Sequence, residues 1–379
     1  MKLIYNIALV FCVFLIACGN TSSENGSFAV ATPVENDAPL PKSFYKKLKG
    51  NIGGNLLITM DLARQDSIVS GSYYYDKYGE PITITGRVSS DDEFTFFEVD
   101  KNYEQIGQFT GRFISREVFE GTWSSLKKKK SLPFNLKETK QGFAEISFEK
   151  FYKENCAAKE KNKQNNNKDE YGFYGDTLCS YIDINLVKVS ANNPSVSKSI
   201  NWSIVNSICG DANKKYNSIN NYLNSIDEEG SEFFVSIEHD CSVVTNDNDI
   251  LCISSWVSQY NGGAAHPVSD GVYLNFDIQT GQTIKLNQIL KPNFSFRLNR
   301  IAEKKFMAEY GSGDFVWDFV PGQFKLNENF AITKTGLLFL FNQYEIGPYA
   351  AGAPEVFIPF REIEDLINPN GLLPNFRRK

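Results

Sequence analysis

Residues 251–278 read LCISSWVSQYNGGAAHPVSDGVYLNFDI, and this stretch organises the second half of the chain. Residues 251–259 have strand character, and apolar and polar residues alternate again over residues 272–278. The connection between them contains two adjacent glycines, which permit positive φ and a close approach to another surface. We therefore predict two strands joined by a loop that presents polar and aromatic groups to a partner. The predicted contact residues of this loop are Tyr260, Asn261, Gly262, Gly263 and His266.

The segments around this stretch predict an α+β domain over residues 141–379, with a mostly antiparallel sheet. Residues 232–244 and 250–260 are expected to pair across an Asn/Asp turn. Apolar residues at helical spacing precede Gly210, which is expected to end a helix, and a second helix is expected from a cap at Ser295 to Gly311. Short helices are also predicted over residues 216–226 and 360–367.

Residues 43–140 predict a β-rich, barrel-like domain of another kind. Short strand runs follow one another at nearly regular spacing, and glycine-bearing or charged turns separate them. Several glycines lie inside strand patterns, where they usually mark a bulge or a tight corner. Tyr73, Tyr75 and Trp123 would line a ligand cup in such a barrel, or they would simply fill it, and we favour filling.

The N-terminus resembles a bacterial lipoprotein signal. A lysine and an eleven-residue apolar run precede Leu15-Ile16-Ala17-Cys18, and that run is too short to span a bilayer. The resemblance implies a signal peptide over residues 1–17 and acylation of Cys18, an anchor of palmitate type. Residues 18–42 are expected to form a flexible tether. The alternative is an ordinary secretory signal with a chance cysteine. Gly19 and Asn20, rather than an aspartate, follow Cys18, and this pattern resembles Gram-negative lipoproteins that are passed on to the outer membrane. The resemblance implies a lipid-anchored protein of the cell envelope, at the outer membrane.

Cysteine usage agrees with export. Five cysteines remain after Cys12 and Cys18, and in an oxidising compartment they can form bridges. One candidate pair is Cys156 with Cys179, which would close a hydrophilic loop. The other is Cys241 with Cys252, which would face each other across a hairpin. The sequence alone secures neither pair.

Composition and motifs argue against several functions. The net charge of −6 gives no basic field for nucleic acid. The sequence has two histidines, no Cys-x-x-Cys pair, no nucleophile elbow and no phosphate-binding loop. We therefore predict no metal, no cofactor and no nucleic-acid partner, and we expect a protein that is not an enzyme.

Residues 142–368 carry three sequence motifs: GGAAH at 262–266, YLNFDIQTG at 273–281, and NQYEIGPYAAG at 342–352, the last of which ends in VFIPF at 356–360. Together they resemble the extracytoplasmic domain family of the lysozyme-sensing anti-sigma-V factor. The same family includes a non-catalytic domain of a peptidoglycan deacetylase. The first motif departs from the family's Gly-Gly-Ala-His by an extra alanine. The resemblance implies an envelope recognition module with a mixed α+β fold.

The function predicted from these observations is a lipid-anchored, non-catalytic envelope module that binds a lysozyme-like protein or a cell-wall glycan. Its contact surface would combine the loop at residues 260–266 with Tyr344 and Tyr349. Alternatively, His266 braces the loop and the two tyrosines form a packed corner. Two rival functions are a cell-wall hydrolase using carboxylates such as Glu345 and Asp270, and a structural subunit of an envelope assembly.

Overall fold

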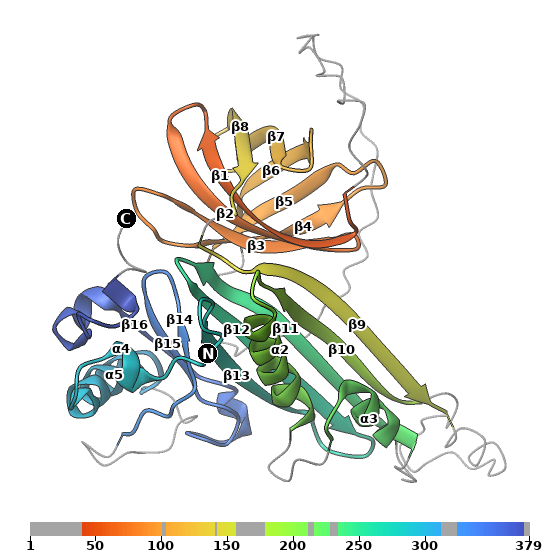
Figure 1. Ribbon diagram of the computed structural model, residues 1–379, viewed down its shortest axis with the longest axis vertical. Coiled ribbons are helices and arrows are strands. Elements are labelled where there is room, and N and C mark those ends of the chain that lie inside the picture. Colours follow the sequence, from red (N-terminus) through yellow and green to blue (C-terminus); the bar gives the residue numbers. More distant parts are fainter. Residues whose placement is uncertain are drawn as a thin grey trace.

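The computed structural model describes residues 40–100, 104–140, 142–156, 179–210, 216–227, 234–311 and 324–374. An eight-stranded barrel lies at one end of the molecule, and a five-stranded sheet extends away from it (Figure 1). Helices cover one face of that sheet, and a small three-stranded sheet lies beside it, next to the edge strand at residues 268–277. The predicted fold class, a β-barrel followed by an α+β region with mostly antiparallel sheets, is confirmed.

The barrel is closed because its first strand pairs with its last, from Leu48 opposite Glu138 to Ile52 opposite Phe134. All neighbouring strands run antiparallel, so short turns suffice to connect them. Its strands are β1 (Ser43–Ile52), β2 (Leu56–Gln65), β3 (Ile68–Tyr75), β4 (Ile82–Val88), β5 (Phe94–Val99), β6 (Gln105–Phe113), β7 (Val118–Ser125) and β8 (Lys130–Glu138).

Aromatic side chains fill the barrel. Phe96 stacks on Phe109 with ring centroids 5.0 Å apart, and the ring of Phe134 lies over Gly111 and Gly121, which pair directly across β6 and β7. A Cβ at Gly111 would come within 2.8 Å of that ring. The glycines therefore make room for a core ring, which is the tight packing that small barrels need.

The residues considered for a ligand cup take part in this packing. Tyr73 is buried, and its hydroxyl donates to the Glu98 carboxylate at 2.5 Å. The Trp123 indole N–H donates to the same carboxylate oxygen, also at 2.5 Å. Tyr75 packs edge-on against Tyr73, at 5.6 Å between centroids. The Tyr73 hydroxyl and the Trp123 N–H thus satisfy a buried carboxylate inside the barrel, as a buried charge requires.

The second sheet has the order β13-β12-β11-β10-β9, and only the β10–β11 pair is parallel. Its strands are β9 (Glu145–Asn155), β10 (Ser180–Ser190), β11 (Val235–Asp247), β12 (Ile250–Asn261) and β13 (Val268–Asp277). The crossover between the parallel strands carries α2 (Pro194–Cys209), α3 (Ile219–Asn224) and the 3₁₀ turn η1 (Ser225–Asp227). The apolar stripe of α2 packs on this sheet, and the helix stops at Gly210 as predicted.

A smaller layer lies beyond β13. Its antiparallel sheet consists of β14 (Phe330–Ile332), β15 (Gly336–Leu340) and β16 (Glu355–Pro359). Helix α5 (Phe294–Tyr310) covers this sheet with Leu298, Ala302 and Phe306, and α4 (Leu286–Ile289) precedes it. The 3₁₀ turn η2 (Tyr349–Ala351) precedes β16.

Two helix predictions differ from the structure. Residues 360–367 form two 3₁₀ turns, η3 (Phe360–Glu362) and η4 (Glu364–Leu366), instead of one helix. Ile363 interrupts them with φ −125 and ψ 20, and Ile367 is held by an isolated β-bridge to Leu290. Helix α5 begins after Asn293, so Ser295 lies inside the helix and is not its cap.

Polar contacts fasten the barrel to the second sheet. Asp247 accepts hydrogen bonds from the Tyr74 hydroxyl at 3.3 Å and from the Lys334 ammonium at 2.6 Å. The Lys334 nitrogen also lies 5.2 Å from the centroid of the Tyr74 ring. Since Tyr74 belongs to β3, Asp247 to β11 and Lys334 to the β14–β15 turn, this cluster joins the barrel to both sheets.

Candidate binding surface at the central loop

The loop between β12 and β13 takes its shape from its two glycines. The Gly262 N–H donates to the Phe234 carbonyl at 2.7 Å, and a Cβ at Gly262 would lie 2.8 Å from the Phe234 ring. Gly263 has φ +84, a conformation that side-chain-bearing residues rarely adopt. The loop therefore requires glycine at both positions, for two different reasons.

Tyr260 and Asn261 make local contacts in this loop. The Tyr260 ring packs on Phe234 at 5.7 Å between centroids, and its hydroxyl donates to the Ala264 carbonyl at 3.2 Å. The Asn261 side chain accepts from the Gln259 amide at 3.1 Å. Both residues shape the loop, and in the described part of the chain neither forms a hydrogen bond or a ring contact with Tyr344 or Tyr349.

The structure brings His266, Tyr344 and Tyr349 together, and we call these three residues the aromatic surface. The His266 ring stacks on Tyr349 with centroids 3.6 Å apart and an interplanar angle of 18°. The Tyr344 hydroxyl lies 3.4 Å from His266 Nε2, and 49% of Tyr344 is exposed. Residues far apart in the sequence thus form one group of rings, in which Tyr344 is exposed and His266 and Tyr349 are half-buried.

Hydrogen bonding indicates the tautomer of His266. Its Nδ1 lies 3.1 Å from the Pro267 carbonyl oxygen, which can only accept. We therefore assign the proton of the neutral ring to Nδ1, which leaves Nε2 to accept from the Tyr344 hydroxyl.

Side-chain amides hold the residues before Tyr344 against the free edge of β13. The N–H groups of Ser269, Gly271 and Tyr273 point outward from this edge at every second residue. Their acceptors are the side-chain oxygens of Gln343 at 2.9 Å, Asn342 at 2.8 Å and Asn329 at 2.9 Å. We call these three amides the amide clamp. The clamp satisfies an edge that would otherwise be open to another strand.

The two carboxylates of the hydrolase hypothesis lie beside this clamp. Glu345 accepts from the Asn342 backbone N–H and from the Asn327 side-chain amide, each at 2.8 Å. Burial raises the pKa of the Asp270 carboxyl above its usual value, and the charge of Glu345 raises it further. Because both Glu345 oxygens brace a turn, the arrangement resembles a structural carboxylate more than a paired acid and base.

The other histidine is structural in its contacts. His239 is buried on β11, and its Nε2 lies 2.8 Å from the Tyr222 hydroxyl. Burial lowers the pKa of its imidazole to about 4, so the ring is neutral at physiological pH.

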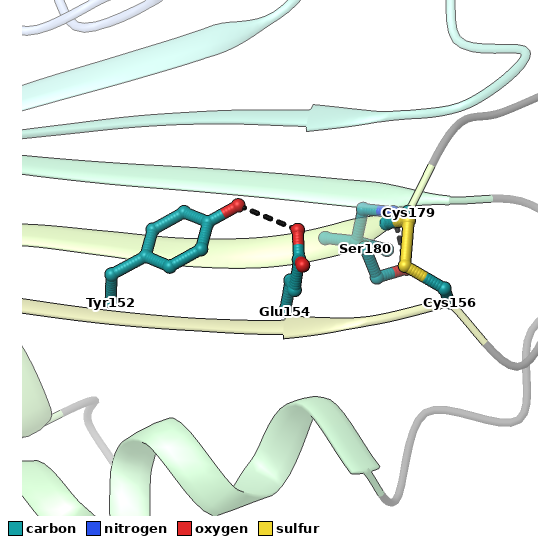
Figure 2. The surroundings of a disulfide bond; sticks show 6 residues. Tyr152, Glu154, Cys156, Cys179 and Ser180 are labelled. Atoms are coloured by element: carbon teal, nitrogen blue, oxygen red, sulfur yellow. Dashed lines mark hydrogen bonds between the residues drawn. A yellow bond between two sulfur atoms is a disulfide. The ribbon is translucent and has the colours of Figure 1, made fainter.

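One of the two candidate disulfides is present. Cys156 and Cys179 are bonded, with Cα atoms 4.3 Å apart, where β9 leads out of the sheet and β10 enters it. Figure 2 shows the bond beside Glu154, which accepts from the Tyr152 hydroxyl at 2.9 Å. Among the described residues, Glu154, Cys156 and Cys179 also have the spacing of metal ligands, but both sulfur atoms belong to the disulfide.

The second candidate pair, Cys241 with Cys252, is wrong. Both thiols are free and buried, as is Cys209. Cys241 lies in the core beneath α2 and approaches Ser255, whereas Cys252 approaches the backbone of Ile332 in the smaller sheet. The two thiols therefore pack in different layers of the structure. In the β11–β12 hairpin, a register shift places Cys252 opposite Thr245.

The lipidation prediction at Cys18, with the signal and most of the tether, lies outside the described residues. Within the described ranges, no helix is both long enough and apolar enough to cross a bilayer.

Comparison with known proteins identifies one family. Residues 287–361 match the model of a protein family of unknown function, DUF3298, so the C-terminal part contains a DUF3298 domain. This segment includes Tyr344 and Tyr349 and excludes the loop that carries His266. No curated protein matches the chain.

Two solved structures of DUF3298 proteins are similar to this chain. One, from Bacteroides fragilis, is 18% identical and has a TM-score of 0.49, over 64% of this chain and 100% of its own. The other, from Pseudomonas aeruginosa, is 16% identical and has a TM-score of 0.43, over 61% and 96%. The resemblance to the anti-sigma-V factor and to the deacetylase is not shown by these comparisons.

Proposed function

We propose that this protein is a lipid-anchored envelope module that binds a partner without catalysis, using the aromatic surface as its contact. The observation that supports the proposal is the stacking of His266 on Tyr349 beside the exposed ring of Tyr344. Tyrosine rings give a large contact area at small rotamer cost, which is why they are frequent at binding hot spots.

The aromatic surface is fixed before a partner arrives. The amide clamp holds Asn342 and Gln343 to β13, and these residues directly precede Tyr344. A rigid contact surface loses little conformational freedom on binding, so more of the contact energy contributes to affinity.

Charge favours a basic protein, lysozyme-like in character, as the partner. Asp270 and Glu345 lie close enough for their charges to interact, and the chain carries a net charge of −6. Such a surface attracts a cationic protein and accelerates its association. A cell-wall glycan is the alternative ligand, because sugar rings also stack on tyrosine.

The binding experiment uses residues 19–379 as a purified chain, with immobilised lysozyme and sonicated peptidoglycan as separate baits. Tyr344→Asn removes the ring and suits the positive φ of 65 at this position, since asparagine tolerates that conformation. We expect at least a tenfold weaker affinity for the favoured bait. Phe296→Ser, on the exposed face of α5, is the control and should bind like wild type. Equal binding by Tyr344→Asn and wild type would reject the aromatic surface as the contact.

A second experiment addresses the rival hydrolase. Purified protein is incubated with peptidoglycan, and released muropeptides are measured for wild type and for Asp270→Asn. We expect no release above buffer from either protein. Release that depends on Asp270 would replace the binding proposal with a catalytic one.

The anchor is tested separately in the producing cell. Wild type should incorporate radiolabelled palmitate and fractionate with the outer membrane, and Cys18→Ser should do neither. Absence of label from wild type would remove the lipid anchor from the proposal.

A further inference from the structure

A pocket lies between the barrel and the DUF3298 segment, built from elements that the aromatic surface does not use. Its volume is about 310 Å³, at the small end of the range for ligand sites, and domain junctions are common places for such sites. Its lining residues are Tyr78 and Glu80 of the β3–β4 turn, Lys334 and Thr335 of the β14–β15 turn, and Phe357, Pro359, Phe360 and Arg361.

The walls of this interdomain pocket are held in place by the contacts that fasten the barrel. Lys334 lines the pocket and is also bound to Asp247 at 2.6 Å, over the ring of Tyr74. This partly buried ion pair joins the two sheets, and the hydroxyl and ring of Tyr74 attach it to the barrel. A ligand would enter a site whose two sides are already positioned.

Two aromatic rings face this pocket and remain accessible. Tyr78 is 68% exposed and Phe357 is 40% exposed. The Phe357 ring lies over Gly336, where a Cβ would come within 2.7 Å of it. Glycine at position 336 lets the Phe357 ring lie close to the sheet, where it forms the bottom of the pocket. Tyr78, from the barrel, forms one side.

The charged groups of the pocket balance one another. Glu80 and Arg361 are exposed, and neither forms an ion pair with any residue that the structure describes. Lys334 is neutralised by Asp247. The pocket therefore offers the planar guanidinium of Arg361 as a donor and the planar carboxylate of Glu80 as an acceptor. Because its charges cancel, it has no net positive charge that would attract an anion.

We propose that the interdomain pocket binds the end of a neutral oligosaccharide. The C–H faces of a sugar ring pack on Tyr78 and Phe357 as apolar surfaces do, and neighbouring hydroxyls match the planar groups of Arg361 and Glu80. This site is additional to the aromatic surface and does not depend on the function proposed for it.

The test titrates the purified chain, residues 19–379, with neutral oligosaccharides of glucose, galactose, mannose and N-acetylglucosamine, by calorimetry and by saturation-transfer NMR. At least one sugar should bind saturably, and Tyr78→Ala and Arg361→Ala should each weaken that binding at least tenfold. Tyr152→Ala removes an exposed ring on β9 and should bind like wild type. Unchanged melting temperatures establish that the variants are folded.

Three results would overturn the inference. One is the absence of saturable binding to every sugar at millimolar concentration. Another is sugar binding that survives Tyr78→Ala and is lost in Tyr344→Asn, which would place the sugar on the aromatic surface. The third is saturable binding of inorganic phosphate that requires Arg361 and competes with sugar, which would make the pocket an anion site.

Discussion

Replacing Asn275 with leucine tests the join between the two sheets. Asn275 lies on β13 and is 4% exposed. Its amide nitrogen donates to the Phe330 carbonyl at 2.6 Å, and its oxygen accepts from the Ile332 N–H at 2.9 Å, so it serves both backbone groups as a neighbouring strand would. Leucine has the same branching pattern as asparagine and can make neither bond. Each unsatisfied buried backbone group costs about 1–3 kcal/mol, so Asn275→Leu should lower the free energy of unfolding by about 2–6 kcal/mol.

The assay is urea unfolding followed by tryptophan fluorescence and by circular dichroism, in which the midpoint should fall with little change in slope. Gln343→Ala is the matched control, because this half-buried amide makes one bond to β13, at 2.9 Å. Its loss should reduce stability by about 0.5–1.5 kcal/mol. The reasoning fails if Asn275→Leu unfolds within 0.5 kcal/mol of wild type, about the smallest gain of one hydrogen bond. It also fails if Gln343→Ala is the more damaging change.

Three other changes have defined outcomes. Replacing Cys156 and Cys179 with serine opens a loop with a sequence separation of 23 and should lower stability by about 3.4 kcal/mol in the chain-entropy account, measured by urea unfolding without reductant. The folded pKa of His239, about 4, is below its unfolded value of about 6.5, so the unfolded state binds the extra proton between these values. Stability should therefore fall as pH drops from about 6.5 to 4, and His239→Gln should flatten that part of a melting-temperature profile. Lys334→Met should lower the free energy of unfolding by about 1–3 kcal/mol because it leaves a poorly solvated carboxylate, while Lys150→Met, at an exposed pair, should change it by less than about 0.5 kcal/mol.

The sequence was sufficient for features that depend on local pattern. The Asn/Asp turn between β11 and β12 was predicted because those residues tolerate positive φ, and Asn248 and Asp249 have φ values of 45 and 69. The strand runs of the barrel and the stop of α2 at Gly210 also follow from nearby residues.

Features that depend on distant partners were not predictable in this way. Asn342 and Gln343 belong to one of the motifs that carry the family resemblance. Their hydrogen bonds to β13, however, join residues more than 70 positions apart in the sequence, and no periodic pattern marks them. Cys241 and Cys252 are not opposite each other because the turn falls at residues 248–249, which places Cys241 opposite Ser255. Ser255 and Cys252 are an odd number of positions apart on β12, so the two cysteines point to opposite faces of the sheet. The sequence nevertheless predicted part of the candidate surface, because His266, Tyr344 and Tyr349 lie together in the structure. Tyr260, which was predicted to join them, packs against Phe234 at the base of the loop.

The amide clamp links the fold of this protein to its proposed function. Asn342 and Gln343 close the edge of β13, and Tyr344 follows them at φ 65 with its ring exposed. The bonds that protect the sheet edge therefore also orient the contact ring. If the clamp loosened, the ring would lose its place opposite His266 before the core unfolded, because the clamp residues are only half-buried. Gln343→Ala should consequently weaken partner binding more than its small effect on stability implies, since binding depends on the order of the surface and unfolding depends on the core.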